Sequence, residues 1–231
     1  MRAGLFLLLT GATVAGAPLL GADLNTIVNK MQQRSARQNA GMCGYTGTRI
    51  YTLHNSHLSN DMVMKYRVTM SRASGKRFKL ISKQHPEFLA RRALKALVQS
   101  EPTTRKQEKQ GNIDRANYRF ALLGEDVLDG HRCYVLQLTP RRNSQYLVLG
   151  KAWVDAQSYA VREIKGKLAK SVSFWVGKPE VDARYAKFDG FWMPSHSWSL
   201  SHVKLVGKTT VIVEFSYDRF QRCAGSVPSA P

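Results

Sequence analysis

The stretch from Val127 to Phe220 constrains the fold most strongly, because it alternates short apolar runs with turn residues and shows no helical period. Asp-Gly pairs at 129–130 and 189–190, and prolines at 140 and 194, separate runs that are rich in Val, Tyr, Phe and Trp. This spacing is typical of an antiparallel meander of strands. The predicted strands cover residues 133–138, 146–154, 159–168, 172–176, 185–188, 191–193, 196–206 and 208–220.

The chain before this stretch mixes helices with strands. Asp23 is placed to cap a helix that extends to Asn39, since apolar residues recur there at helical spacing. A second helix is predicted from Pro86 to Val98, and the charged segment Gln99–Asn117 is predicted to be a mobile loop or lid. Further strands are predicted over residues 46–53, 62–71, 76–82 and 118–123. The fold class is therefore α+β and mainly β.

The strand at residues 62–71 carries methionine and aromatic side chains on one face. Met62, Met64, Tyr66, Val68 and Met70 alternate with mostly polar or charged residues, so they share one side of the strand. Methionine is flexible and polarisable, and such a face suits a surface that adapts to variable apolar shapes. The same side chains would equally fill an ordinary core.

Several other strands also show one apolar and one wet face, which is the pattern of a sheet that curves around its own concave side. One or two helices are expected to cover that side. The predicted lining of an apolar cavity is Met62, Met64, Tyr66, Met70, Trp153, Trp198, Leu200, Val213 and Phe215, each of which would also serve as a plain core residue.

The N-terminus has the features of an export signal. Arg2 precedes an apolar run and then small residues, with possible cleavage after Ala15, Ala17 or Ala22. An uncleaved anchor or a disordered N-terminus is the alternative. We predict a signal peptide at residues 1–22, one domain at residues 23–223 and a disordered tail at residues 224–231, in a protein of the periplasm or an equivalent oxidising space.

The chain is strongly basic, with 35 Lys and Arg against 16 Asp and Glu and a formal net charge of +19. Between Lys65 and Arg119 there are fifteen basic and four acidic residues. Such a charge attracts anions of any kind, although export argues against nucleic acid as a partner. Basic side chains on the wet face of the strands would also simply keep the protein soluble. A basic rim is predicted at Arg91, Arg92 and Lys95.

Three cysteines leave at least one unpaired within the chain. Cys43 lies just before the first predicted strand and Cys223 just after the last, so a disulfide between them would tie the ends of the fold together. Spacing alone does not fix this connectivity. Cys133 lies inside a strand and is predicted to be a small buried hydrophobe.

The sequence offers little for catalysis or metal binding. His196 and His202 share a strand face but are about 20 Å apart, too far to bind one ion. His131 and Cys133 would share a face, which suggests a thiolate and imidazole pair, yet the apolar setting makes the thiol inert. No nucleophile elbow, carboxylate pair or phosphate loop is present in the sequence. We therefore predict no enzyme, no cofactor and no metal.

Several motifs together resemble the bacterial lipoprotein-carrier superfamily (LolA/LolB-like). They are Leu128-Asp129-Gly130, the run Cys133–Pro140, Trp153-Val154-Asp155 and Asp189–Pro194, followed by a long final hairpin. The resemblance covers residues 23–220. It implies an unclosed antiparallel β-barrel, with helices in its mouth acting as a plug or lid over an apolar cavity, and a role in carrying the acyl chains of lipoproteins or lipids.

Two functions follow from these observations. The first is a non-enzymatic periplasmic carrier or binder of lipid or lipidated protein, in an apolar cavity with a basic rim. The second is an envelope interaction or sensing module, in which the same fold has a packed interior and a basic face that docks a membrane-associated protein or an anionic surface. A Cys/His hydrolase is a distant third. The ligand, the docking partner and the oligomeric state stay open.

Overall fold

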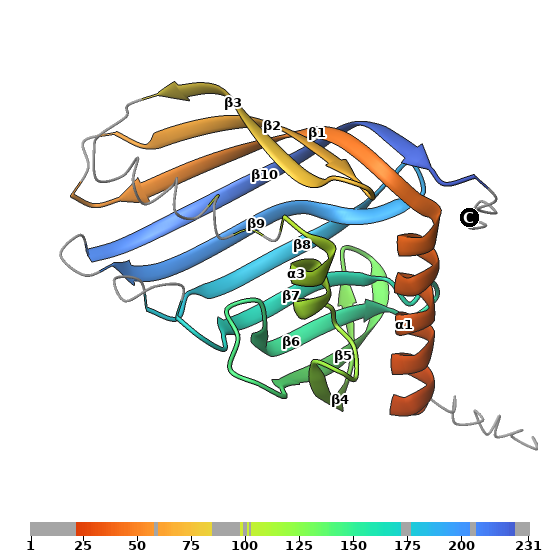
Figure 1. Cartoon of the computed structure of the whole chain (residues 1–231). Coiled ribbons are helices and arrows are strands. Elements are labelled where there is room, and N and C mark those ends of the chain that lie inside the picture. Colours follow the sequence, from red (N-terminus) through yellow and green to blue (C-terminus); the bar gives the residue numbers. More distant parts are fainter. Residues whose placement is uncertain are drawn as a thin grey trace, which may run out of the picture.

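A computed structural model of the chain describes residues 22–57, 60–84, 98, 101, 103–171, 177–203 and 207–224. These residues form one ten-stranded sheet and two helices (Figure 1). The strands are β1 (Met42–Asn55), β2 (Met62–Ser71), β3 (Gly75–Gln84), β4 (Tyr118–Leu128), β5 (His131–Pro140), β6 (Val148–Asp155), β7 (Val161–Leu168), β8 (Glu180–Phe188), β9 (Phe191–Val203) and β10 (Gly207–Arg222). The helices are α1 (Leu24–Gly41) and α3 (Arg105–Gln110).

The sheet is antiparallel throughout and does not close. Its order is β3-β2-β1-β10-β9-β8-β7-β6-β5-β4, so β3 and β4 are the two edges. Strands that are adjacent in the sheet are also neighbours in the sequence, with the exception of β1, which pairs with β10. Figure 1 shows the sheet curving around α1, which stands across one end, and α3 in front of the middle strands. The predicted curved, mainly β fold is confirmed as an open half-barrel.

The helix α1 covers part of one face of the sheet, which we call the inner face. It begins where predicted, because the Asp23 carboxylate accepts hydrogen bonds from the backbone N–H groups of Asn25 and Thr26. Its apolar stripe packs against the inner side chains of the neighbouring strands β5 and β6. This cluster contains Ile27, Val28 and Met31 of α1 with Tyr134, Leu136 and Val154.

Both Asp-Gly pairs form the tight turns that the sequence predicts. Asp129 and Gly130 join β4 to β5, and Asp189 and Gly190 join β8 to β9. All four residues have positive φ angles, between 46° and 84°. Two central residues with positive φ define the turn type that matches the twist of a hairpin, and Asp-Gly adopts it at low cost.

The predicted break at Pro194 is wrong. β9 continues through this residue, because the pairing with β8 shifts between Arg184 and Tyr185 and leaves Ser195 without a partner in the register. A β-bulge is the place where a strand interior tolerates proline, which has no N–H to donate. Two predicted strands are therefore one.

The predicted loop at residues 99–117 contains the short helix α3, which is a second correction. Thr104 and Gln107 cap its start reciprocally: the Gln107 side chain accepts from the Thr104 N–H, and the Thr104 hydroxyl accepts from the Gln107 N–H. The predicted strand 172–176, the signal peptide and the helix 86–98 apart from Val98 lie outside the described residues. Neither described helix is long and apolar enough to cross a membrane.

Cys43 and Cys223 form a disulfide in the structure. The bond joins the start of β1 to the residue that follows β10, two strands that already pair along their whole length. Its sequence separation is 180 residues, so it fixes a contact between the two ends of the described chain.

Candidate functional site

The inner face of β2, β1 and β10 carries a continuous apolar surface. Three successive rows of cross-strand neighbours build it, and the register of the two strand pairs defines each row. Because side chains alternate along a strand, residues paired directly across the sheet share a face. The rows are Met62, Leu53 and Val211; Met64, Tyr51 and Val213; and Tyr66, Arg49 and Phe215.

We call the eight uncharged members of these rows the methionine–tyrosine surface. All are buried except Phe215, which packs at its margin. The middle row continues across the whole sheet through Ser197, Ala183, Ile164 and Ala152 to Leu136, which contacts α1. The methionine–tyrosine surface and α1 therefore lie on the same face of the sheet.

One charged residue, Arg49, is enclosed within this surface at 6% exposure. Its guanidinium group lies 4.9 Å from the ring centre of Phe215 and 5.3 Å from that of Phe78. It also forms an ion pair with Glu101, whose second carboxylate oxygen accepts from the Tyr51 hydroxyl. A buried cation needs such compensation, so these three partners hold Arg49 in an otherwise apolar setting.

Val98 is packed against the methionine–tyrosine surface and is 7% exposed. It precedes Glu101 by three residues, so Val98 contacts the inner face through its apolar side chain and Glu101 through its ion pair with Arg49.

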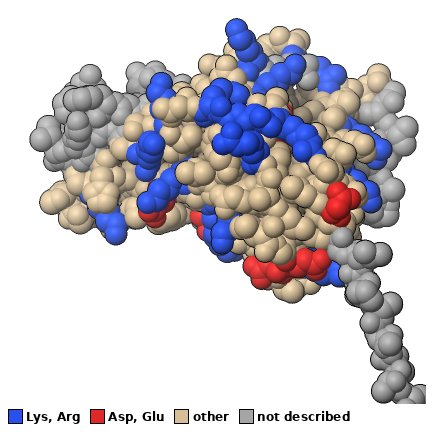
Figure 2. All heavy atoms as spheres, turned by 90° about the horizontal axis from the view of Figure 1, so that it is seen from below, with Lys and Arg blue, Asp and Glu red and all other residues tan. Residues whose placement is uncertain are grey.

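The predicted rim residues Arg91, Arg92 and Lys95 lie outside the described residues. Figure 2 shows Lys and Arg side chains over much of the face seen from below, with Asp and Glu in a few small groups.

The structure brings together five of the nine predicted lining residues: Met62, Met64, Tyr66, Val213 and Phe215. Met70 faces the same side but belongs to a neighbouring aromatic cluster around Tyr45 and Phe191. The remaining three are a correction, since they lie on the outer face.

The strand register places these three residues outside. Trp198 is paired with Ile212, and Leu200 with Thr210, each one position away from the inner residues of β10. Trp153 is paired with Glu163, and its indole N–H donates to Asp126 at 2.9 Å. The inner positions beside them are Ala152 and Val154 in β6, and Ser197 and Ser199 in β9.

The sequence reasoning also missed the contribution of β1. Tyr51, Leu53 and Arg49 all alternate toward the inner face, and β1 lies between the two strands that were recognised. The alternation of Tyr51 and Leu53 was available as a signal. Nothing local to β1 indicated that Arg49 would be buried, because that depends on Glu101, 52 residues later.

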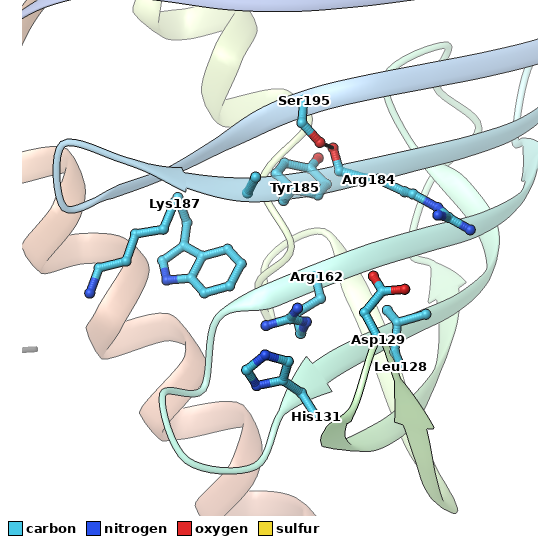
Figure 3. Close-up of a pocket in the computed structure, with 10 residues that line it drawn as sticks. Leu128, Asp129, His131, Arg162, Arg184, Tyr185, Lys187 and Ser195 are labelled. Carbon is cyan, nitrogen blue, oxygen red and sulfur yellow. Dashed lines mark hydrogen bonds between the residues drawn. The ribbon is translucent and has the colours of Figure 1, made fainter.

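Two pockets lie away from the methionine–tyrosine surface, at the end of the sheet near α1. The larger, of about 550 Å³, is lined by His131, Arg162, Arg184, Lys187 and Trp192 among others (Figure 3). The smaller, of about 220 Å³, lies between α1 and the strands, with Met31, Arg34, Gln38, Ile113 and Trp192 in its wall. Both pockets include Tyr185 and Trp192. We refer to them as the basic pocket and the helix pocket.

Cys133 is the free cysteine of the described chain and is fully buried. Burial, with a smaller effect of the nearby Asp155 charge, raises the pKa of its thiol. A raised pKa keeps the sulfur protonated at neutral pH, which is the opposite of what a nucleophile needs.

Across the ranges that the structure describes, no three His, Cys, Asp or Glu side chains gather in a way that would hold a metal ion.

No protein-family model matches the chain, and no curated protein matches it. Solved structures do match. A DUF1329 family protein from Desulfovibrio piger is 13% identical, with 87% of this chain and 94% of that chain covered and a TM-score of 0.47. A domain from Vibrio parahaemolyticus, named as an outer membrane lipoprotein-sorting protein, is 14% identical, with 88% and 94% covered and a TM-score of 0.48.

A third match is a LolA superfamily protein from Nitrosomonas europaea. It is 14% identical, with 83% of this chain and 90% of that chain covered and a TM-score of 0.42.

Proposed function

We propose that the protein is a non-enzymatic, exported binder or carrier of acyl chains, supplied by a lipid or a lipidated protein. The methionine–tyrosine surface carries this proposal. Its two methionines, Met62 and Met64, lie in adjacent rows beside two tyrosines, on the inner face of an open sheet. Flexible and aromatic side chains in this arrangement suit a ligand of variable apolar shape.

The free energy available to such a site is considerable. Each methylene group that leaves water contributes about 0.8 kcal/mol. In the structure Val98 covers part of the surface. An acyl chain would take the place of the Val98 side chain, so the net gain comes from the methylene groups that it buries beyond the area that Val98 already covers.

The proposed location is the periplasm or an equivalent oxidising compartment. The Cys43–Cys223 disulfide supports it, because such bonds persist outside the reducing cytosol. The formal net charge of +19 would attract the anionic head groups of envelope lipids. The superfamily resemblance of the sequence is in keeping with both.

A second candidate is an envelope interaction or sensing module with a packed interior. The observation in its favour is that Val98 packs against the methionine–tyrosine surface and covers part of it, while the two pockets lie elsewhere in the fold. On this account the protein would dock a membrane-associated protein or an anionic surface and would hold no acyl chain.

Native mass spectrometry of the gently purified protein, with lipid extraction and a fluorescent fatty-acid titration alongside, separates the two. The test variant is Phe215→Asp, which places a carboxylate at the half-buried margin of the surface. The control is Val63→Asp, which makes the same kind of change on the outer face of β2. A bound acyl species that is lost only in Phe215→Asp supports the carrier. A protein that carries no acyl species and does not bind the fluorescent fatty acid overturns the carrier proposal and favours the interaction module.

A further inference from the structure

Three buried N–H donors lack partners at one place in the fold. Among the described residues, Arg34 Nε, Arg162 Nε and Trp192 Nε1 are buried with no hydrogen-bond acceptor. Burying such a donor unpaired is unfavourable, and native proteins rarely leave several together. An acceptor-rich group bound there would remove this cost.

The three side chains come from three different elements that meet near the end of the sheet. Arg34 belongs to α1, Arg162 lies near the start of β7 and Trp192 follows the turn between β8 and β9. The Arg162 guanidinium group is 5.3 Å from the centre of the Trp192 ring. Arg34 and Trp192 both line the helix pocket, whereas Arg162 and Trp192 both line the basic pocket. Trp192 therefore belongs to the wall that the two pockets share, together with Tyr185.

The junction of α1 with β9 is held by contacts outside the three donors. The Gln38 side-chain amide donates to the Trp192 carbonyl and accepts from the Trp192 N–H, both at 2.8 Å. These two bonds hold α1 against the hairpin of β8 and β9. The site is therefore built from packed elements, and a ligand would find it largely preorganised.

The positive charge here is only partly compensated. Arg162 Nη1 and His131 Nδ1 each lie 3.6 Å from Asp155 Oδ2, which is too long for a good hydrogen bond. The other oxygen, Oδ1, already accepts from the backbone N–H groups of Gln157 and Ser158 and from the Ser158 hydroxyl. Asp155 is also the carboxylate that acts on Arg34. One carboxylate thus faces two guanidinium groups.

Arg34 also has incomplete charge compensation. Burial lowers the pKa of its guanidinium group, and the Asp155 charge offsets the effect only in part. Arginine nevertheless remains charged in proteins.

Figure 3 shows Arg162 and His131 pointing toward one another, while Arg184 points away from them. Arg184 is bound to Glu163 at 3.0 Å, so it is less available than Arg34 and Arg162.

We propose that the junction of the helix pocket and the basic pocket binds a phosphate-type oxyanion, with Arg34, Arg162 and the Trp192 indole N–H as its donors. Guanidinium groups pair with phosphate oxygens in a planar, bidentate manner, and an indole N–H adds a third direction. The oxyanion is either a free inorganic ion or the phosphate of a lipid head group. The inference does not depend on acyl binding by the methionine–tyrosine surface.

The test is isothermal titration calorimetry on the purified chain in a chloride buffer. Inorganic phosphate is one titrant, and soluble dihexanoyl phosphatidylglycerol is the other. Arg34→Gln and Arg162→Gln each remove one charge and its donors. Arg37→Gln is the matched control, because it removes one charge from an exposed position on the same helix. Trp192→Phe tests the indole N–H while keeping an aromatic ring, and serves if a charge variant fails to fold.

We expect both arginine variants to weaken binding by about tenfold or more, and Arg37→Gln to change it by less than about twofold. Phosphate binding identifies a site for free oxyanions, whereas binding of phosphatidylglycerol alone identifies a head-group site. Dihexanoyl phosphatidylcholine, which carries no net charge, is expected to bind weakly in either case. Absence of binding to both titrants, or equal losses in Arg37→Gln and the site variants, would overturn the proposal.

Discussion

Gln38 and Trp192 are joined by two hydrogen bonds of 2.8 Å that pair the side-chain amide of a helix residue with both backbone groups of a strand residue. The glutamine amide takes the place that a neighbouring strand would occupy. The contact spans 154 residues of sequence and fixes the C-terminal half of α1 to the hairpin of β8 and β9.

Replacing Gln38 by Ala removes both bonds and leaves the Trp192 backbone groups without this partner. We expect the free energy of unfolding to fall by about 1–3 kcal/mol. Urea denaturation followed by circular dichroism measures this, and hydrogen exchange at the Trp192 amide should become faster. Gln33→Ala, on the exposed side of the same helix, is the control and should stay within about 0.5 kcal/mol of the parent. Equal effects of the two substitutions would contradict the proposed anchoring role.

The disulfide gives a second prediction. A Cys43→Ser, Cys223→Ser double variant loses a link across 180 residues, and we expect it to be about 2–5 kcal/mol less stable. Reduction of the parent protein should lower the thermal midpoint in the same way, without changing Cys133. An unchanged midpoint after complete reduction, verified by thiol alkylation and mass spectrometry, would show that the β1 and β10 ladder needs no such link.

Stability at alkaline pH should depend on Tyr185. Burial of its hydroxyl group, with a smaller effect of Tyr118, raises the pKa from 10.0 to about 12. The unfolded chain therefore releases the proton first, so this contribution to stability is complete below pH 10 and is lost as the pH rises toward 12. Between pH 9 and 11 the parent should lose about 1 kcal/mol more than Tyr185→Phe, as measured by urea denaturation. Parallel losses in the two proteins would refute the assignment.

On the outer face, Glu163 is a buried carboxylate whose partners can be tested. Its side chain is 1% exposed and contacts Arg184 Nε and Lys165 Nζ, each at 3.0 Å. Arg184→Ala leaves it with one cation, and we expect a loss of about 1–3 kcal/mol in urea denaturation. Lys167→Ala breaks an exposed pair with Glu180 and should cost less than about 1 kcal/mol. The reverse order would argue against burial as the cause.

The strand pattern was predictable because it is local. The alternation in residues 62–71 placed Met62, Met64 and Tyr66 correctly on one face, since period-two patterns follow directly from the geometry of a strand. For β6 and β9 the same argument chose the wrong face. The inner positions there include Ala152 and Val154 in β6 and Ser197 in β9, and each is smaller than the tryptophan next to it.

The basic pocket could not be predicted for a different reason. Arg162 is skipped in the pairing of β6 with β7, and Ser195 is skipped in the pairing of β8 with β9. Both lie at β-bulges, which redirect side chains without leaving a clear signal in a single sequence. The position of Arg34 beside them also depends on how α1 docks, which only the tertiary structure specifies.

The pairing of β1 with β10 has a consequence for the order in which the chain can fold. The first strand pairs with the last, from Met42 opposite Arg222 to Asn55 opposite Thr209. Contacts between such distant segments form slowly, because the entropy of closing a long loop is lost before the contacts lower the free energy. The unit of β1, β2 and β3 therefore keeps one edge of β1 unpaired until β10 has formed. A chain cut before β10 would leave these three strands without a sheet to join.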